Sequence, residues 1–366
     1  MKHRIKQRDL EQLAAYWDDL CVNPKLTYLF LELTDACNLT CLHCGSCASP
    51  QNRTYLPFDI IKKVLQSVAK KYTPGQIMVC LTGGEPLMHP DFYKIARYAV
   101  DLGFSCGITT NGTLIDERAA GEIVASGIGS VSFSLDGLED SHDWFRSGKG
   151  SYARTIHGIK ALVEASRGRM VTQVTTVVHR GNLGQLDELY RQVLQLGVHS
   201  WRVINLEPIG RALQYPHLLL SAEEMKDLLT YIRNLRYSIH TPIDITYGCS
   251  HYLTTEFERE VRDNYFLCGS GIYVGSVLCN GDIFSCLDIP RRPELVQGNV
   301  FRDDFVDVWE NRFREFRTDR CETSQICRDC PERRFCRGDA THTWDFDKQE
   351  PLLCVRKLCF LKGEAL

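Results

Sequence analysis

Three cysteines near the N-terminus have a spacing that suits a metal cluster. Cys37, Cys41 and Cys44 form the pattern Cys-x3-Cys-x2-Cys. Three thiolates from one short loop can bind three irons of a [4Fe–4S] cube and leave the fourth iron open to a small ligand. A zinc site is the alternative, because His43 or Cys47 could supply the fourth ligand that a closed tetrahedral zinc site needs.

A second group of cysteines lies towards the C-terminus. It consists of Cys268, Cys279, Cys286, Cys321, Cys327, Cys330, Cys336, Cys354 and Cys359. The spacing Cys327-x2-Cys330-x5-Cys336 suits a zinc ribbon as well as a further iron–sulfur cluster. The 17 cysteines of this 366-residue chain are too few for a secreted disulfide scaffold, where cysteine exceeds about 8%. Their grouping therefore favours metal ligation in a reducing compartment.

The composition argues against several classes of partner. Lys and Arg number 43 against 46 Asp and Glu, so the net charge is −3 and gives no global attraction to nucleic acids or anionic membranes. Apolar runs such as residues 28–33 are far shorter than the ~20 residues of a membrane-spanning helix. We therefore expect a cytoplasmic protein with no nucleic-acid or membrane partner. Eight arginines against five acids within residues 311–337 could attract an acidic peptide, although such runs are usually solvated.

Strand and helix signals alternate between the two groups of cysteines. Strands are expected at residues 28–33, 77–81, 105–109, 130–135, 171–178, 201–206 and 243–246. Helices are expected at residues 58–71, 91–102, 116–125, 152–165, 183–196 and 222–235. Six consecutive strand–helix units predict an α/β fold with a parallel sheet and functional loops at the carboxyl ends of its strands. A full eightfold barrel takes about 250 residues, so we expect a partial (β/α)6 barrel of the TIM type.

The pattern changes after about residue 248. An Asn280-Gly281 turn predicts a hairpin between residues 272–278 and 283–286, and residues 303–317 read as one helix. The remaining loop-rich stretch needs a cofactor to organise it. We therefore expect an N-terminal helical segment at 1–26, a partial barrel at 27–248 and a small cysteine-rich iron–sulfur domain at 249–366.

Four motifs, each after a predicted strand, occur in a fixed order along the chain. The three-cysteine loop is followed by Gly83-Gly84-Glu85-Pro86, Thr110-Asn111-Gly112 and Ser134-Leu135-Asp136-Gly137. In this order the motifs resemble those of the radical S-adenosylmethionine (SAM) enzymes. The resemblance implies that Cys37, Cys41 and Cys44 bind the [4Fe–4S] cluster that cleaves SAM. It also implies a set of SAM-binding residues: Gly83, Gly84, Glu85, Pro86, Thr110, Asn111, Ser134, Asp136 and Arg146.

The resemblance assigns these residues more specific roles. The glycine-rich turn would approach the amino group of SAM, Asn111 and Asp136 would hold SAM or its ribose, and Arg146 would lie near the SAM carboxylate. Glu85 and Asp136 could also be read as a general acid–base pair. The chemistry implied is reductive cleavage of SAM to a 5′-deoxyadenosyl radical, which takes a hydrogen atom from an unactivated carbon. An electron donor such as flavodoxin or ferredoxin is implied as a partner.

The C-terminal cysteines resemble the SPASM extension, which carries auxiliary [4Fe–4S] clusters. The resemblance implies that an outer cluster is bound by Cys327, Cys330, Cys336 and Cys354. Cys268 and Cys286 remain for an inner cluster, whose pattern expects a cysteine where this chain has Ala340. Possible substitutes are Cys279, Cys249, Cys321, Cys359, Asp339 and His342. Cys279 could instead be an inert core thiol.

Enzymes of this type commonly modify ribosomally made peptides, by crosslinking, epimerisation or oxidation, and we expect that activity here. Only some 26 residues precede the first predicted strand, against the roughly 80 residues of a peptide-recognition domain. Recognition would then come from a separate protein, or the substrate would be a small molecule of cofactor or antibiotic biosynthesis. A non-catalytic peptide-binding scaffold is the remaining alternative.

Overall fold

The computed structural model describes residues 7–238, 241–248 and 251–360. Strands β1 to β7 are parallel and follow one another in the sheet in chain order. They are Tyr28–Glu32, Met78–Thr82, Ser105–Thr110, Ser130–Ser134, Val171–Val178, Ser200–Asn205 and Asp244–Tyr247. The α/β class, the parallel sheet and all seven predicted strands are confirmed, with ends shifted by a residue or two.

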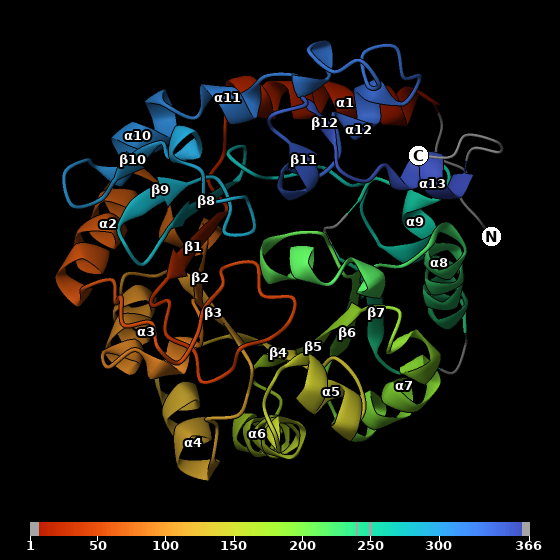
Figure 1. Cartoon of the computed structure of the whole chain (residues 1–366). Coiled ribbons are helices and arrows are strands. Elements are labelled where there is room, and N and C mark those ends of the chain that lie inside the picture. Colours follow the sequence, from red (N-terminus) through yellow and green to blue (C-terminus); the bar gives the residue numbers. More distant parts are fainter. Residues whose placement is uncertain (1–6, 239–240, 249–250, 361–366) are drawn as a thin grey trace.

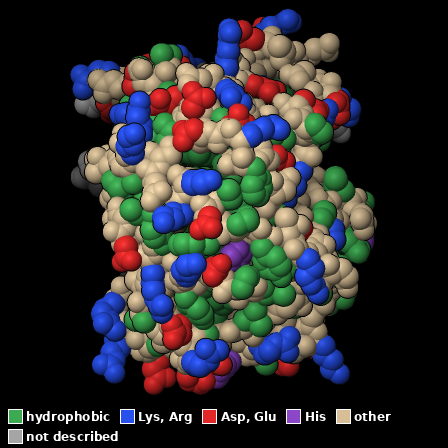
Figure 2. Space-filling view, turned by 90° about the vertical axis from the view of Figure 1, so that its left-hand side faces the viewer, with side chains coloured by type: hydrophobic (Ala, Val, Ile, Leu, Met, Phe, Trp, Pro, Cys, Tyr) green, Lys and Arg blue, Asp and Glu red, His purple; other side chains and the backbone are tan. Residues whose placement is uncertain are grey.

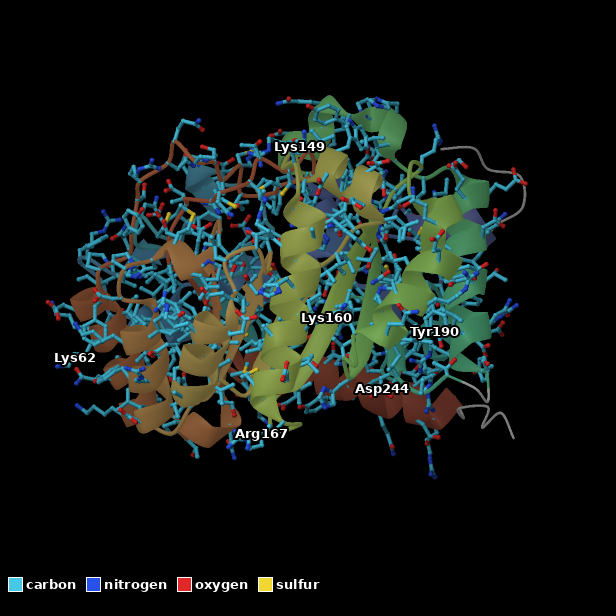
Figure 3. The ribbon with its side chains drawn as sticks, turned by 90° about the horizontal axis from the view of Figure 1, so that it is seen from below. Lys62, Lys149, Lys160, Arg167, Tyr190 and Asp244 are labelled. Carbon is cyan, nitrogen blue, oxygen red and sulfur yellow. The ribbon has the colours of Figure 1, made fainter. Side chains whose placement is uncertain are left out.

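Helices cover the outer side of the curved sheet (Figure 1). They are α2 (Phe58–Lys71), α3 (Phe92–Asp101), α4 (Glu117–Ala125), α5 (Glu139–Phe145), α6 (Ser151–Ser166), α7 (Leu186–Gln195) and α8 (Ala222–Arg236). The short helix α5 has no counterpart among the predicted helices. In Figure 3, Lys149 and Arg167 mark the two ends of α6 at opposite edges of the molecule. Among the described helices, none combines the length and apolar character that a bilayer-spanning helix needs.

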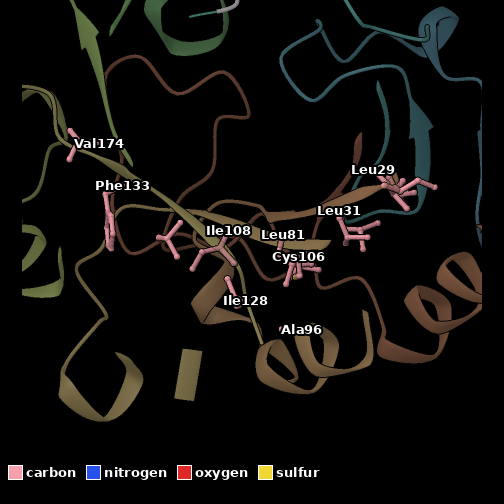
Figure 4. Close-up of a cluster of buried hydrophobic side chains, with 14 of the residues drawn as sticks. Leu29, Leu31, Leu81, Ala96, Cys106, Ile108, Ile128, Phe133 and Val174 are labelled. Atoms are coloured by element: carbon pink, nitrogen blue, oxygen red, sulfur yellow. The ribbon is translucent and has the colours of Figure 1, made fainter. Parts of the chain in front are cut away.

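The main core lies between the sheet and these helices. Successive side chains of a strand point to opposite faces, and Leu31, Leu81 and Ile108 point to the side that carries Ala96 of α3 (Figure 4). These side chains are at most 4% exposed. The opposite face of the sheet, which we call the inner face, carries mostly polar residues.

The C-terminal hairpin extends the same sheet. Strands β8 (Val274–Val277) and β9 (Asp282–Phe284) are antiparallel, as predicted, and β8 pairs in parallel with β1. With β10 (Gly298–Asn299) the sheet has ten strands, and its edges are β7 and β10. The sheet therefore forms a partial barrel and continues past residue 248, where the domain boundary stays a prediction. The remaining strands, β11 (Trp344–Asp345) and β12 (Glu350–Pro351), form a separate pair.

The prediction of a single helix at residues 303–317 is wrong. The structure has two helices there, α10 (Phe305–Asn311) and α11 (Arg314–Arg317). The Arg317 guanidinium donates hydrogen bonds to the carbonyl oxygens of Trp309 (2.6 Å) and Glu310 (3.4 Å). These carbonyls lie in the last turn of α10, so a side chain satisfies them in place of a continuing helix. Three short helices complete the C-terminal part: α9 (Glu258–Val261), α12 (Arg333–Cys336) and α13 (Val355–Phe360).

The N-terminal helix α1 (Gln7–Val22) packs on the C-terminal part of the chain. Figure 1 shows α1 beside α11 and α12. Its buried residues are Leu10, Ala14, Trp17 and Leu20, and they join a cluster with Tyr252, Phe266, Ile272, Phe335 and Ala340. At the rim, Arg334 pairs with Glu11 at 2.8 Å and Arg337 pairs with Asp18. Part of the basic run noted in the sequence therefore binds α1.

We predict that Trp17→Ala lowers the free energy of unfolding by about 3 kcal/mol, because Trp17 is only 4% exposed and its truncation leaves a cavity. The matched control is Tyr16→Ala, since Tyr16 is 49% exposed on the same helix and should change the free energy by no more than about 0.5 kcal/mol. Urea denaturation followed by circular dichroism measures both. Equal effects of the two variants would contradict the packing of α1.

Candidate functional site

The three-cysteine loop follows β1 at the carboxyl edge of the sheet. Cys37 and Cys41 are buried and Cys44 is half-buried, and all three pack with Leu39 and Ala48 in one small apolar cluster. Burial raises the pKa of Cys37 to about 12, and the neighbouring thiols add to this effect. Adjacent buried thiolates repel one another and need a positive partner. The chemistry of this donor set therefore fits an iron–sulfur cluster.

A zinc site, the alternative, requires ligands that converge on one ion. Among residues 7–238, 241–248 and 251–360, no three His, Cys, Asp or Glu side chains converge in that way. A [4Fe–4S] cube spreads its ligands further apart, because each thiolate binds a different iron.

The glycine-rich turn after β2 lies directly against this loop. Gly84 N donates to Thr34 O (2.7 Å) and Glu85 N donates to Ala36 O (2.9 Å). A Cβ atom at Gly84 would lie 2.3 Å from Ala36 O and 2.9 Å from the Cys37 Cβ. Gly83 has a positive φ of 154°. Both glycines are therefore required by the cysteine loop itself, in addition to any approach to a ligand.

Glu85 joins the motifs after β2 and β3. Its buried carboxylate accepts hydrogen bonds from Thr110 Oγ1 (2.7 Å) and Asn111 N (2.8 Å). Burial raises its pKa to about 7, although these hydrogen bonds oppose that change. Pro86, also buried, begins a short 3-10 turn after Glu85. Glu85 therefore connects the turn after β2 to the end of β3 through hydrogen bonds. This structural role argues against a general acid–base pair of Glu85 and Asp136.

Asn111 extends the contact from β3 to the cysteine loop. Its side-chain nitrogen donates to Asn38 Oδ1 (2.9 Å) and lies 4.0 Å from the Cys37 sulfur. Its side-chain oxygen accepts from Thr113 N and Thr113 Oγ1. Hydrogen bonds with Asn38 and Thr113 therefore fix the Asn111 amide close to Cys37, a candidate cluster ligand.

A buried ion pair joins the motif after β4 to the same loop. Arg146 Nε donates to Asp136 Oδ2 at 2.6 Å, and Arg146 Nη1 lies 3.8 Å from the Cys41 sulfur. Burial would raise the pKa of Asp136, but the guanidinium outweighs it and the pKa is lowered. The other oxygen, Oδ1, accepts from Val177 N at 2.8 Å. Ser134, the last residue of β4, is half-buried beside them.

Three histidines surround this ion pair: His142 and His179 are buried and His43 is half-buried. The ring of Phe145 stacks between His43 (centroids 4.3 Å apart) and His179 (4.1 Å), and His142 Nδ1 accepts from Asp136 N. Burial lowers the pKa of His43 to about 3 and those of His142 and His179 to about 4, so the rings are neutral at pH 7. His43 Nδ1, His142 Nε2 and His179 Nε2 have no hydrogen-bond partner within the described part of the chain. Unpartnered buried nitrogens fit a polar ligand such as SAM at this place.

One further residue, not predicted from the sequence, fixes the cysteine loop. Arg211, in the 3-10 turn Gly210–Gln214 after β6, donates from Nε to Cys41 O (2.7 Å) and from Nη1 to Ala48 O (2.9 Å). Gly210 lies so close that a Cβ atom there would be 2.3 Å from Cys44 O. The pair Gly210-Arg211 in a loop after a strand was the available signal, but its partner lies some 170 residues away.

The C-terminal cysteines line one cavity. Cys327, Cys330, Cys336 and Cys354, the predicted outer ligands, share this cavity with Cys321. The Cys321 thiol donates a hydrogen bond to Cys327, which lowers the pKa of the Cys327 thiol. Five thiols around one cavity fit an iron–sulfur cluster. Cys321 therefore lies with the outer set, not with the inner set for which it was a predicted substitute.

The predicted inner ligands, Cys268 and Cys286, do not line this cavity. Cys268 Sγ accepts from Thr341 N (3.3 Å), next to Ala340, which is buried in the α1 cluster. Cys286 packs against the main core. Cys279 is buried beside Glu32, and burial and this carboxylate raise its pKa, which suits an inert thiol. Of the other predicted substitutes, Cys359 packs against α8, and Cys249 lies outside the described residues.

Asp339, another predicted substitute, binds a buried histidine instead. His251 Nδ1 lies 2.8 Å from Asp339 Oδ2, and Nε2 lies 2.8 Å from Glu207 Oε1 without hydrogen-bond geometry. Burial favours the neutral ring, but the two carboxylates raise the pKa of His251 to about 10. A charged imidazolium therefore connects the loop after β6 to the C-terminal part. His342, the last of the predicted substitutes, lies in the 3-10 turn Thr341–Thr343.

Comparisons with known proteins find matches to two families. Residues 31–193 match the radical SAM superfamily, and residues 268–331 match the SPASM family, described as an iron–sulfur cluster-binding domain. The AdoMet-dependent heme synthase of Oleidesulfovibrio alaskensis is 29% identical over 86% of this chain and 84% of that protein. The mycofactocin maturase MftC of Mycobacterium ulcerans is 27% identical over 84% of this chain and 80% of that protein.

Among solved structures, SuiB of Streptococcus suis bound to S-adenosylmethionine has a TM-score of 0.72. It is 18% identical and covers 92% of this chain and 78% of its own, a likeness that concerns the fold. The two family matches imply SAM and a [4Fe–4S] cluster as cofactors, with auxiliary iron–sulfur binding at the C-terminal cysteines. This chain is therefore an enzyme that contains a radical SAM domain and a C-terminal SPASM domain.

Proposed function

We propose that this enzyme modifies a ribosomally made peptide or protein by radical hydrogen abstraction, leading to a crosslink, an epimerised centre or an oxidised residue. The observation that carries the radical chemistry is the convergence of the loops after β1, β2, β3 and β4 on the three clustered thiols of Cys37, Cys41 and Cys44. With the cluster and SAM bound, one-electron reduction supplies a 5′-deoxyadenosyl radical. The likeness to MftC over 84% of the chain supports a peptide substrate.

The residues of this chain would divide the work as follows. Cys37, Cys41 and Cys44 would hold the cluster. Asp136 and Arg146 would orient SAM, with the unpartnered histidine nitrogens as further polar contacts. Leu39 and Ala48 exclude water from the thiols because they pack on them. Gly83, Gly84, Pro86, Thr110, Asn111 and Ser134 would complete the SAM site.

Tailoring of a small molecule is the second candidate. The heme synthases of Oleidesulfovibrio alaskensis and Methanosarcina barkeri are 28–29% identical over 86–89% of this chain, which favours a cofactor-like substrate. Mass spectrometry of a co-expressed candidate peptide distinguishes the two. A SAM-dependent loss of hydrogen from the peptide, or uptake of deuterium from D2O at an epimerised centre, supports the first candidate, and turnover of a small molecule alone supports the second.

We also propose partners and a location. A flavodoxin or ferredoxin would supply the electron. A separate peptide-recognition protein would present the substrate, because the apolar face of α1 is already packed on the C-terminal part.

The described cysteines are free thiols, which supports a cytoplasmic location. Lys and Arg side chains are interspersed with Asp and Glu on the face in Figure 2, which supports no nucleic-acid partner.

We predict that alanine at Cys37, Cys41 and Cys44 together abolishes 5′-deoxyadenosine formation from SAM and dithionite, since three thiolates anchor the cluster. Cys47→Ala is the matched control, because Cys47 lies in the same loop but is exposed; this variant should retain at least about half of the activity. Chromatography of the reaction products under anaerobic conditions measures both. Unchanged cleavage by the triple variant would show that the cluster assignment is wrong.

Asp136→Asn should weaken SAM binding and lower the free energy of unfolding by about 3 kcal/mol, because it leaves the buried Arg146 charge without its partner. Iron content should stay near the wild-type value, since Asp136 is not a predicted ligand. Asp140→Asn on the exposed side of α5 is the control and should change neither property. Calorimetric titration with SAM and urea denaturation are the measurements. Loss of iron equal to that of the triple cysteine variant would contradict this assignment.

In the background of the triple cysteine variant, we expect about four irons per chain, which corresponds to one auxiliary cube. Adding Cys327→Ala should remove most of this iron, because Cys327 lines the C-terminal cavity. Adding Cys359→Ala should not, because Cys359 packs on α8. Iron analysis with Mössbauer spectroscopy measures the content. About eight irons would mean that the inner site is complete despite Ala340, and zinc in place of iron would overturn the cluster assignment.

A further inference from the structure

Arg202 is a cation on the inner face of the sheet. On β6 its neighbours Trp201 and Val203 are fully buried in the core beneath the helices. Because side chains alternate along a strand, Arg202 points to the opposite side, into the barrel, where it is half-buried. Its positive charge opposes the effect of burial on the pKa of Cys80, an inner-face residue of β2. The guanidinium therefore faces the interior that β2 and β6 enclose.

The inner face around Arg202 is largely polar and accessible. Thr109 is exposed although β3 lies between β2 and β4, so solvent reaches the middle of the sheet. The half-buried polar residues of this face include Cys80, Ser132, Ser134, Gln173 and Ser200, and the half-buried Met78 and Ile204 lie on it too. Several are already hydrogen-bonded to one another, for example Ser132 Oγ with Thr175 Oγ1 at 2.8 Å. The face therefore offers hydroxyl and amide groups, and its exposed carboxylate, Asp244 of β7, pairs in register with Ser200 and lies more than 4.0 Å from Arg202.

The guanidinium has few partners of its own. Nε donates to Thr175 Oγ1 at 3.1 Å. Among the described residues, no carboxylate oxygen lies within 4.0 Å of Arg202. A guanidinium carries five N–H donors, so most of them point to accessible space. The buried Arg146 and the partly buried Arg291 differ, because each has a carboxylate partner, Asp136 and Glu32 respectively.

We propose that Arg202 binds a carboxylate group of the substrate inside the barrel. A planar guanidinium with free donors suits a carboxylate, which it can bind through two parallel hydrogen bonds. Arg202 pairs in register with Thr175, and Thr175 with Ser134 of the SAM motif. Two strand spacings, about 10 Å, therefore separate the Arg202 backbone from that motif. The inference rests on the proposed function, because it takes the barrel interior as the place where the substrate binds.

The test measures how fast phenylglyoxal, an arginine-specific reagent, labels Arg202 in reconstituted holoenzyme with SAM bound. Peptide mass spectrometry reads the extent of labelling at each arginine. The probes are acetate and the tripeptide N-acetyl-Ala-Ala-Ala, each compared with its amide. A carboxylate at twice its dissociation constant should slow labelling about threefold, because the free fraction is 1/(1 + [L]/Kd). Labelling of Arg118, which is exposed on α4, is the internal control and should not change.

Each outcome decides the proposal. Slower labelling by the acids but not by the amides supports it; protection at lower concentration by the tripeptide than by acetate points to a peptide terminus, and the reverse to a small acid. Equal protection by acid and amide, no protection, or no labelling of Arg202 at all overturns it. Full protection by SAM alone also overturns it, because Arg202 would then serve SAM. The measurement needs no turnover, so failure to cleave SAM would count against the proposed function only.

Discussion

The buried ion pair of Asp136 and Arg146 holds the candidate site together. Asp136 has no exposed surface, and its two oxygens bind the guanidinium of Arg146 and the backbone of Val177 on β5. An unpaired charge in this place would cost several kcal/mol. The pair therefore couples β4, β5 and α5, and through Arg146 it brings a positive charge to within 3.8 Å of the Cys41 sulfur. That charge favours a thiolate where burial alone disfavours one.

The cysteine loop takes its shape from its neighbours more than from its own sequence. Backbone hydrogen bonds from the turn after β2 hold one side, and Arg211 holds the other through the carbonyl oxygens of Cys41 and Ala48. Leu42 N also donates to Phe145 O on α5. Ligands that are fixed by packing and outer hydrogen bonds keep their geometry when a cofactor binds or leaves. The site is thus a product of several strand-end loops.

Local patterns predicted the sheet well because the strands alternate with helices of clear periodicity, as at β5 and α2. The motifs after β2, β3 and β4 were also found, since each follows a strand end. Features that depend on distant partners could not be predicted. The break between α10 and α11 depends on Arg317, and the shape of the cysteine loop depends on Arg211. Only the structure shows that Cys321 lines the same cavity as Cys327. Short α5 was missed because seven residues carry too little periodicity.

The junction at His251 limits how freely the two halves of this protein can be exchanged with those of its relatives. Glu207 comes from the barrel, whereas His251 and Asp339 come from beyond residue 248. A chimera that keeps this barrel but takes another C-terminal half retains the buried Glu207 carboxylate, whose partner in this protein is the imidazolium of His251. Unless the new half supplies a cation near Glu207, the buried negative charge has no partner at the junction. Successful recombination therefore requires that the crossover preserve an electrostatic match, and not merely the pattern of cysteines.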